Sequence, residues 1–188
     1  RYSNILPADT NISLSLSNKI NLKVPFLSSA MDTVTESKMA IAIAKAGGIG
    51  IIHRNLKIKN QSNEIKKVKR KDYFVGAAIG TNKEDLERAR SLSDSGVDLI
   101  VIDTAHGHSA KVLKTLSKIK KINSKISICV GNIATGEAAK KLYNSGADII
   151  KVGIGPGSIC TTRMVAGIGV PQISAIMEVK KALNKKEI

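Results

Sequence analysis

The sequence contains the stretch Asp98-Leu99-Ile100-Val101-Ile102-Asp103, in which apolar residues run without interruption between two carboxylates. A strand that is apolar at every position is buried on both faces, as in a parallel sheet covered by helices. Similar short runs recur along the chain, and a helical pattern follows each of them; we expect strands at 24–30, 49–53, 74–80, 98–103, 126–132 and 149–153. The spacing of roughly 22–28 residues favours a (β/α)8 barrel, a TIM barrel, over an open doubly wound sheet.

The expected helices begin at recognisable start signals. Thr33 with Glu36, and Thr81 with Glu84, have the spacing of a capping box. Glycines follow several helical patterns and predict their ends. We therefore expect helices over about 36–46, 56–70, 81–96, 109–122, 135–145 and 171–184.

The composition indicates a globular chain with a basic surface. Among 188 residues, 43% are hydrophobic, and 30 Lys+Arg against 15 Asp+Glu give a net charge of +15. Lys111, Lys114, Lys118 and Lys121 repeat at helical spacing, which is typical of a solvated helix face. Aromatic residues are only 3%, so stacking platforms for nucleic acid are scarce. A polyanion-binding barrel remains a weaker alternative, and no apolar run approaches the ~18 residues of a membrane span.

The two cysteines predict a protein of a reducing compartment, the cytoplasm. The start at Arg1 shows no apolar leader, which agrees with that location. Cys129 lies within an expected strand and is interpreted as a structural residue.

The second cysteine lies in the glycine-rich stretch Lys151–Arg163, which reads KVGIGPGSICTTR. Alternating glycines let a backbone turn sharply and expose its amides and carbonyls to a ligand. The stretch lacks the ending of a Walker A loop and the spacing of a dinucleotide fingerprint. Cys160 lies among hydroxyl groups and next to Arg163, a setting that favours the thiolate. We therefore expect Cys160 to be a nucleophile, with a small buried hydrophobe as the alternative.

Polar residues follow several expected strands, where a barrel places its active site. Asp103 suits the hydroxyl groups of a ribose, although it also suits a helix or loop cap. His106 and His108 could chelate a metal only with a third ligand, and none is evident nearby. The stretch 28–33 either forms a loop or positions a substrate.

Four stretches together resemble the inosine-5′-monophosphate (IMP) dehydrogenase family: SSAMDTVTE at 28–36, GGIGIIH at 47–53, DTAHGHS at 103–109 and GIGPGSICTTR at 153–163. They occur in family order over essentially the whole chain. The resemblance implies a (β/α)8 barrel, a homotetramer, and NAD-dependent oxidation of IMP to xanthosine 5′-monophosphate in guanine nucleotide synthesis. It also implies that potassium shapes the cysteine loop.

Site roles follow from the resemblance alone. Cys160 would attack the purine, with Thr162 beside it. The IMP-binding residues would be Ser29, Met31, Asn132 and Ser158. The NAD-binding residues would be Asp103, Thr104, Ala105, Gly153, Ile154 and Gly155. The potassium ligands would be the backbone carbonyls of Gly155, Gly157 and Cys160.

Two further expectations concern relatives and domains. GMP reductase shares a similar cysteine loop and is the nearest alternative activity. Family members commonly carry a CBS regulatory module before the third strand, whereas here Arg70 runs directly toward Tyr73, with the junction near 70–72. We expect residues 1–188 to be one catalytic domain without that module, supplying about six βα units of the eight. The remaining strands and the flap with a water-activating arginine are expected beyond Ile188.

Overall fold

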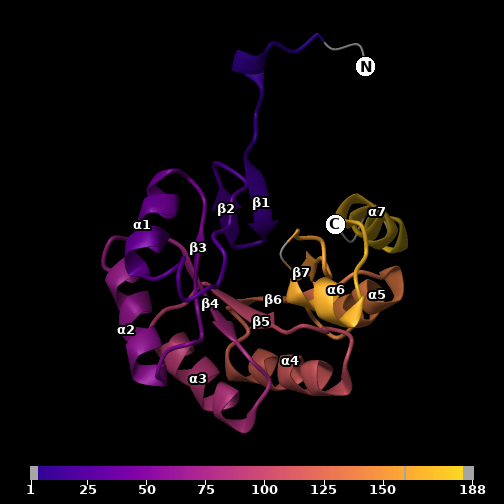
Figure 1. The fold of residues 1–188 in the computed structure, drawn as a ribbon. Coiled ribbons are helices and arrows are strands. Elements are labelled where there is room, and N and C mark those ends of the chain that lie inside the picture. Colours follow the sequence, from indigo (N-terminus) through magenta and orange to yellow (C-terminus); the bar gives the residue numbers. More distant parts are fainter. Residues whose placement is uncertain (1–3, 159, 184–188) are drawn as a thin grey trace.

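The structure is a computed structural model that describes residues 4–158 and 160–183. Its centre is a parallel sheet whose strands follow one another in chain order, each paired with the next. The strands are β3 (Gly50–Ile52), β4 (Val75–Ile79), β5 (Leu99–Asp103), β6 (Ser127–Ile133) and β7 (Ile149–Val152). This alternation of parallel strands with helices is the architecture of a partial TIM barrel (Figure 1).

Helices surround one side of the sheet, and an antiparallel hairpin lies on the other (Figure 1). The hairpin consists of β1 (Leu14–Ser17) and β2 (Ile20–Leu22), and a short 3-10 helix, η1 (Pro7–Asp9), precedes it. The helices are α1 (Ser37–Lys45), α2 (Ile58–Lys69), α3 (Lys83–Asp94), α4 (Ala110–Ile122), α5 (Gly136–Asn144), α6 (Thr161–Ala166) and α7 (Gln172–Ala182). None of the helices in the described residues is both long and apolar enough to cross a bilayer.

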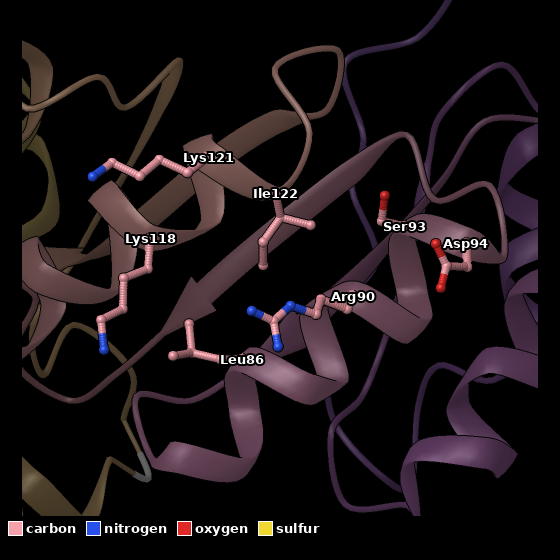
Figure 2. A pocket seen from close by; sticks show the side chains of 7 residues that line it. All are labelled: Leu86, Arg90, Ser93, Asp94, Lys118, Lys121 and Ile122. Atoms are coloured by element: carbon pink, nitrogen blue, oxygen red, sulfur yellow. The ribbon is translucent and has the colours of Figure 1, made fainter.

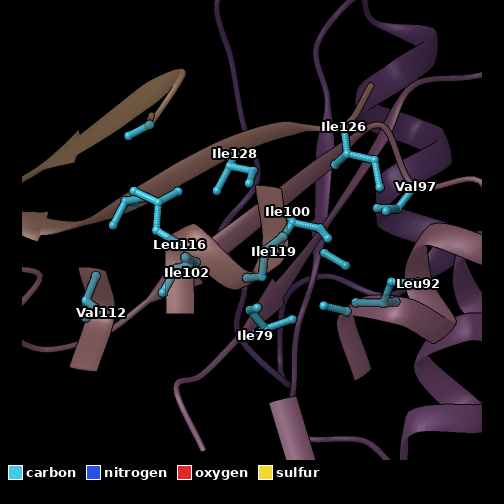
Figure 3. Close-up of a cluster of buried hydrophobic side chains, with 14 of the residues drawn as sticks. Ile79, Leu92, Val97, Ile100, Ile102, Val112, Leu116, Ile119, Ile126 and Ile128 are labelled. Carbon is cyan, nitrogen blue, oxygen red and sulfur yellow. The ribbon is translucent and has the colours of Figure 1, made fainter. Parts of the chain in front are cut away.

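Each face of strand β5 packs against a hydrophobic core, which explains why its sequence is apolar throughout. Ile100 and Ile102 belong to the larger core, between the sheet and the helices (Figure 3). Leu99 and Val101 belong to a second core, between the sheet and the hairpin. Since successive side chains of a strand point to opposite faces, both faces of the sheet are buried. The prediction drawn from the apolar run 98–103 is therefore confirmed.

The first expected strand is much shorter than predicted. Within 24–30, the structure forms a single parallel bridge, between Leu27 and Ile49. Pro25 cannot donate a hydrogen bond to a neighbouring strand, which explains why the pairing does not extend toward the start of this run.

Both predicted capping boxes are wrong. Helix α1 has Glu36 as its N-cap, and the amide of Ser37 donates to the carboxylate of Glu64 at 2.8 Å, so a side chain from α2 does the capping. Helix α3 begins one residue later than the Thr81–Glu84 pattern indicates. Its capping box is formed by Asn82 and Asp85, with the Asn82 amide donating to the Asp85 carboxylate at 2.9 Å.

A tight turn joins α2 to β4 at the place where the sequence suggests the domain junction. The amide of Lys71 donates to Val68 O and the amide of Asp72 to Lys69 O, both at 2.9 Å. Asp72 adopts a φ of 59°, the left-handed conformation that Asp tolerates better than most residues. In the structure, the chain thus passes from α2 to β4 without any intervening element.

Candidate functional site

The carboxyl ends of β5, β6 and β7 lie side by side and form the centre of the candidate site. Asp103 pairs in register with Gly131, and Gly131 pairs with Lys151. The Lys151 ammonium reaches across Gly131 and donates to Asp103 Oδ1 at 2.8 Å. A Cβ at position 131 would lie 2.6 Å from Lys151 Cβ, so glycine is what leaves room for this ion pair.

The chain beyond these strand ends is held by further hydrogen bonds. The amide of Asn132 donates to Thr104 O at 2.8 Å, and the Thr104 hydroxyl donates to Gly131 O at 2.8 Å. The amide of Gly153 donates to Ile133 O at 2.7 Å. The structure therefore brings Asp103, Asn132 and Gly153 together, as the sequence predicts; Ala105 lies exposed beside them.

The amide oxygen of Asn132 is buried and has no hydrogen-bond partner among the described residues. A buried acceptor without a partner is destabilising, and a ligand N–H or O–H removes that penalty. Together with the Asp103 carboxylate, this oxygen suits a ligand that presents hydroxyl or N–H groups.

The cysteine loop leaves β7 and returns to it. The amide of Val170 donates to Ile154 O at 2.9 Å and closes the base of the loop. Gly155 has a φ of +65°, and a Cβ there would lie 2.7 Å from Ile168 O, so this turn requires glycine. Ser158 is exposed, and Ile159 lies outside the described residues. Cys160 is half-buried and directly precedes α6.

The two thiols have opposite electrostatic settings. Hydrogen bonds from the backbone N–H of Arg163, and from the backbone and hydroxyl of Thr162, outweigh the effect of burial and lower the pKa of Cys160. Burial raises the pKa of Cys129 from 9.0 to about 12. A thiolate is the nucleophilic form of cysteine, so the structure supports Cys160 and not Cys129 as the reactive residue.

The three carbonyls expected to bind potassium are hard oxygen donors of the right chemical class. Gly157 O already accepts from Cys160 N at 3.2 Å and from the Arg163 guanidinium at 3.1 Å. Cys160 O accepts from Met164 N at 3.0 Å. A carbonyl oxygen has two lone pairs, so a cation at Gly157 would require the guanidinium to move away.

The segment that carries Ser29 and Met31 lies against β3, at the opposite edge of the sheet from β7. The amide of Ser28 donates to Ile49 O at 3.1 Å. Both the Ser29 and the Met31 side chains are exposed. Within residues 4–158 and 160–183, no hydrogen bond or ion pair joins this segment to the Cys160 loop, so these two parts of the predicted site are positioned independently.

A basic hollow on the outer side of the helices provides a test of the polyanion alternative. It lies between α3 and α4, measures about 610 Å³ and is lined by Leu86, Arg90, Ser93, Asp94, Lys118, Lys121 and Ile122. In Figure 2 the side chains of Lys118 and Lys121 extend away from the Arg90 guanidinium. The cations do not converge on one point, which is typical of a solvated surface and does not favour a polyanion site.

The family model for the IMP dehydrogenase / GMP reductase domain matches residues 1–188. The chain belongs to this family. An inosine-5′-monophosphate dehydrogenase of Borreliella burgdorferi is 43% identical, covering 100% of this chain and 59% of the relative. The enzyme of the same name from Cryptosporidium parvum is 44% identical over 98% of this chain and 56% of its own length. That from Aquifex aeolicus is 33% identical, with 100% and 64% covered. The chain thus spans somewhat more than half of these relatives.

Sequence reasoning missed two residues of the site. Lys151 is the ion-pair partner of Asp103, and its only signal is a single cation in the otherwise apolar strand Ile149–Val152. Thr35 is fully buried and bonded to the backbone of Ser29, and nothing in its sequence context separates it from the neighbouring Thr33.

Proposed function

We propose that this chain is the catalytic-barrel portion of an NAD-dependent IMP dehydrogenase, with residues 1–188 forming one domain without a CBS module. The proposal depends mainly on Cys160. Its thiol has a lowered pKa, and it lies in the glycine-rich loop that follows β7, at the carboxyl edge of the sheet. Family membership supports the same activity, and the relatives that carry this name cover the chain almost completely.

In the first step, the Cys160 thiolate adds to C2 of the purine and forms a carbon–sulfur bond. The C2 hydrogen then leaves with its electron pair, and a thioimidate remains on Cys160. NAD supplies the chemistry of a hydride acceptor. Water adds to C2 of the thioimidate, and one of its hydrogens passes to the purine ring nitrogen while the other leaves as a proton to solvent. The carbon–sulfur bond then breaks, and the Cys160 thiolate and xanthosine 5′-monophosphate are released. Thr162 stabilises the thiolate through its backbone N–H and its hydroxyl.

Binding groups come from both sheet edges. Ser158, which is exposed, would bind the IMP phosphate, with Ser29, Met31 and Asn132 around the nucleotide. The NAD-binding residues would be Asp103, Thr104, Ala105, Gly153, Ile154 and Gly155. The Asp103 carboxylate accepts well from ribose hydroxyls. The free acceptor of Asn132 can take a ligand hydrogen.

Potassium would be held by the carbonyls of Gly155, Gly157 and Cys160 once the Arg163 guanidinium has left Gly157 O, and its charge would hold the cysteine loop in shape. The proposal includes a homotetramer and a cytoplasmic location. Two free cysteines support a reducing compartment.

The test is turnover by the full-length protein. IMP with NAD should produce NADH and xanthosine 5′-monophosphate, whereas GMP with NADPH should give no reaction. The reverse result would establish GMP reductase. Neither turnover, with salt-dependent retention of DNA, would establish the polyanion-binding alternative.

A further inference from the structure

The buried residue Thr35 connects the two residues of the 28–36 segment that the proposed function places against the nucleotide. Its hydroxyl lies 2.6 Å from Ser29 O and donates to it, and its backbone amide donates to Met31 O at 3.0 Å. Its side chain is 0% exposed. One residue therefore holds the backbone of Ser29 and the backbone of Met31, while both of their side chains stay exposed.

Thr35 is itself fixed to the sheet. The amide of His53, directly after β3, donates to Thr35 O at 3.4 Å. The Thr35 hydroxyl also lies 2.9 Å from Ser28 Oγ, whose oxygen accepts from the Ile51 amide at 3.4 Å. Strand β3 thus supports the exposed segment, and such support from a strand helps to hold a binding group in a productive geometry.

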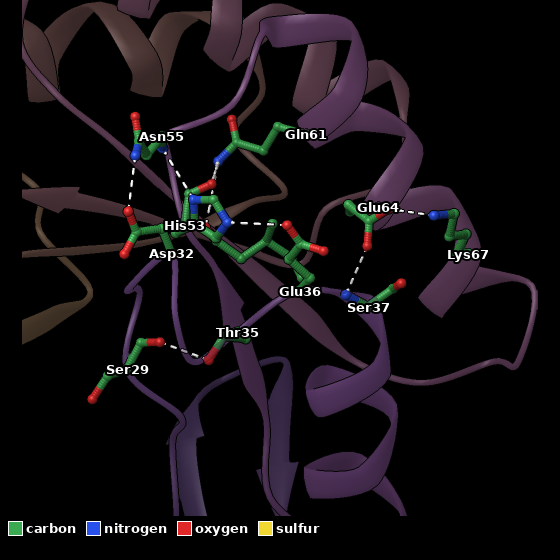
Figure 4. A network of polar contacts seen from close by, with 11 residues as sticks. Ser29, Asp32, Thr35, Glu36, Ser37, His53, Asn55, Gln61, Glu64 and Lys67 are labelled. Carbon is green, nitrogen blue, oxygen red and sulfur yellow. Dashed lines mark hydrogen bonds and ion pairs between the residues drawn. The ribbon is translucent and has the colours of Figure 1, made fainter.

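A second set of contacts holds the outer turn of the segment (Figure 4). The amide of Asn55 donates to His53 Nδ1 at 3.1 Å, so the neutral imidazole carries its hydrogen on Nε2, which lies 3.4 Å from Glu36 Oε1. The Asn55 side chain donates to Asp32 Oδ2 at 2.9 Å. Asn55 therefore connects Asp32 to His53, at the end of β3, independently of the Thr35 hydroxyl.

From this geometry we propose that Thr35 is a positioning residue for nucleotide binding, acting through the backbone of Ser29 and Met31, with Asn55 in a lesser supporting role. The inference rests on the proposed function. Thr35 does not touch the substrate; its hydroxyl holds the backbone of Ser29, and its amide holds the backbone of Met31. The free energy of one neutral buried hydrogen bond corresponds to about a five- to tenfold change in an equilibrium constant. We therefore expect its loss to weaken IMP binding by about that factor.

The test compares Thr35→Val, which keeps the shape but loses the hydroxyl, with Thr35→Ser, which keeps the hydroxyl. IMP binding to the full-length protein is measured by calorimetry without NAD, and steady-state kinetics are measured for both substrates. Thr35→Val should raise the Kd and KM for IMP about five- to tenfold, with kcat at saturating IMP and KM for NAD nearly unchanged. Thr35→Ser should restore most of the affinity.

Thr115 offers a matched control, because it is another buried threonine whose hydroxyl donates to a backbone carbonyl, Lys111 O, at 2.9 Å. It lies in α4, outside the segment, so Thr115→Val should leave IMP affinity unchanged. Should Thr35→Val fail to fold, Thr35→Ala provides the second variant, because it also removes the hydroxyl, and it should raise the Kd for IMP about five- to tenfold. Asn55→Ala tests the supporting role of Asn55 separately, with an expected two- to threefold rise in that Kd.

Each outcome decides the inference. Unchanged IMP affinity in Thr35→Val, equal losses in Thr35→Val and Thr115→Val, or no rescue by serine would overturn it while the wild-type protein still oxidises IMP. If Thr35→Val does not fold, unchanged affinity in Thr35→Ala overturns it. A wild-type protein that neither binds IMP nor reduces NAD overturns the proposed function and this inference with it.

Discussion

The two cysteines should react with a disulfide reagent at very different rates in the folded protein. Burial raises the pKa of Cys129 from 9.0 to about 12, whereas backbone hydrogen bonds from Arg163 and Thr162 lower that of Cys160. Near neutral pH, the thiolate fraction of Cys129 is thus reduced about 1,000-fold relative to an ordinary cysteine, because each pKa unit is a factor of about ten. A more basic thiolate is intrinsically more reactive, by about 20-fold over this range, which leaves a difference of at least about 50-fold.

The assay is reaction with 5,5′-dithiobis(2-nitrobenzoate), with peptide mass spectrometry locating the modified thiol at each time. Cys160 should be modified first, and Cys129, which is 5% exposed, should follow only on unfolding. In urea, both thiols should react at comparable rates, which controls for local sequence. In the Cys160→Ala variant, only the slow reaction of Cys129 should remain. Modification of Cys129 at a rate similar to that of Cys160 in the native protein would refute the electrostatic reasoning.

Three further predictions concern the core, a helix cap and the proposed cofactor site. Leu116→Ala, at a fully buried position of the main core, should lower the free energy of unfolding in urea by about 3 kcal/mol, and a loss below about 1 kcal/mol would contradict the packing. Burial alone would raise the pKa of Glu64, but hydrogen bonds from Lys67 and the Ser37 amide lower it below 4.5. The stabilisation is therefore present above pH 4.5 and lost as pH falls through the folded pKa, so Glu64→Ala should cost about 1 kcal/mol at neutral pH and little in acid, as measured by thermal unfolding across pH. Asp103→Asn should raise the KM for NAD about 10- to 100-fold with little effect on the KM for IMP, and an equal effect on both substrates would argue against its assignment.

The sequence predicted the sheet well because burial on both faces leaves a local signature. Leu99 and Ile100 are adjacent in sequence, yet their side chains enter different cores. A polar residue would therefore be buried at either position, and the strand is apolar at both. The helix starts were less predictable, because neighbouring residues offer the same spacing. Asn82 with Asp85 satisfies the capping pattern as well as Thr81 with Glu84 does, and only the three-dimensional structure decides between them.

The sequence predicted those residues of the candidate site that lie at the ends of strands. It did not predict the contacts that depend on how neighbouring strands pair. Asp103 and Asn132 follow apolar runs, which is a signal along the chain. The ion pair of Asp103 with Lys151 depends on Gly131 lying between them in the sheet, and the residue spacing along the chain does not encode that pairing. The same holds for Thr35, whose role comes from contacts with Ser29 and with the end of β3.

The central claim is that Cys160 forms the covalent intermediate with the purine. Its most direct test is to incubate the full-length protein with IMP and NAD, quench the reaction, and search by mass spectrometry for a purine nucleotide adduct. The adduct should lie on the peptide that contains Cys160 and should be absent when NAD is omitted or in Cys160→Ala. An adduct on Cys129, or turnover of IMP by Cys160→Ala, would contradict the account.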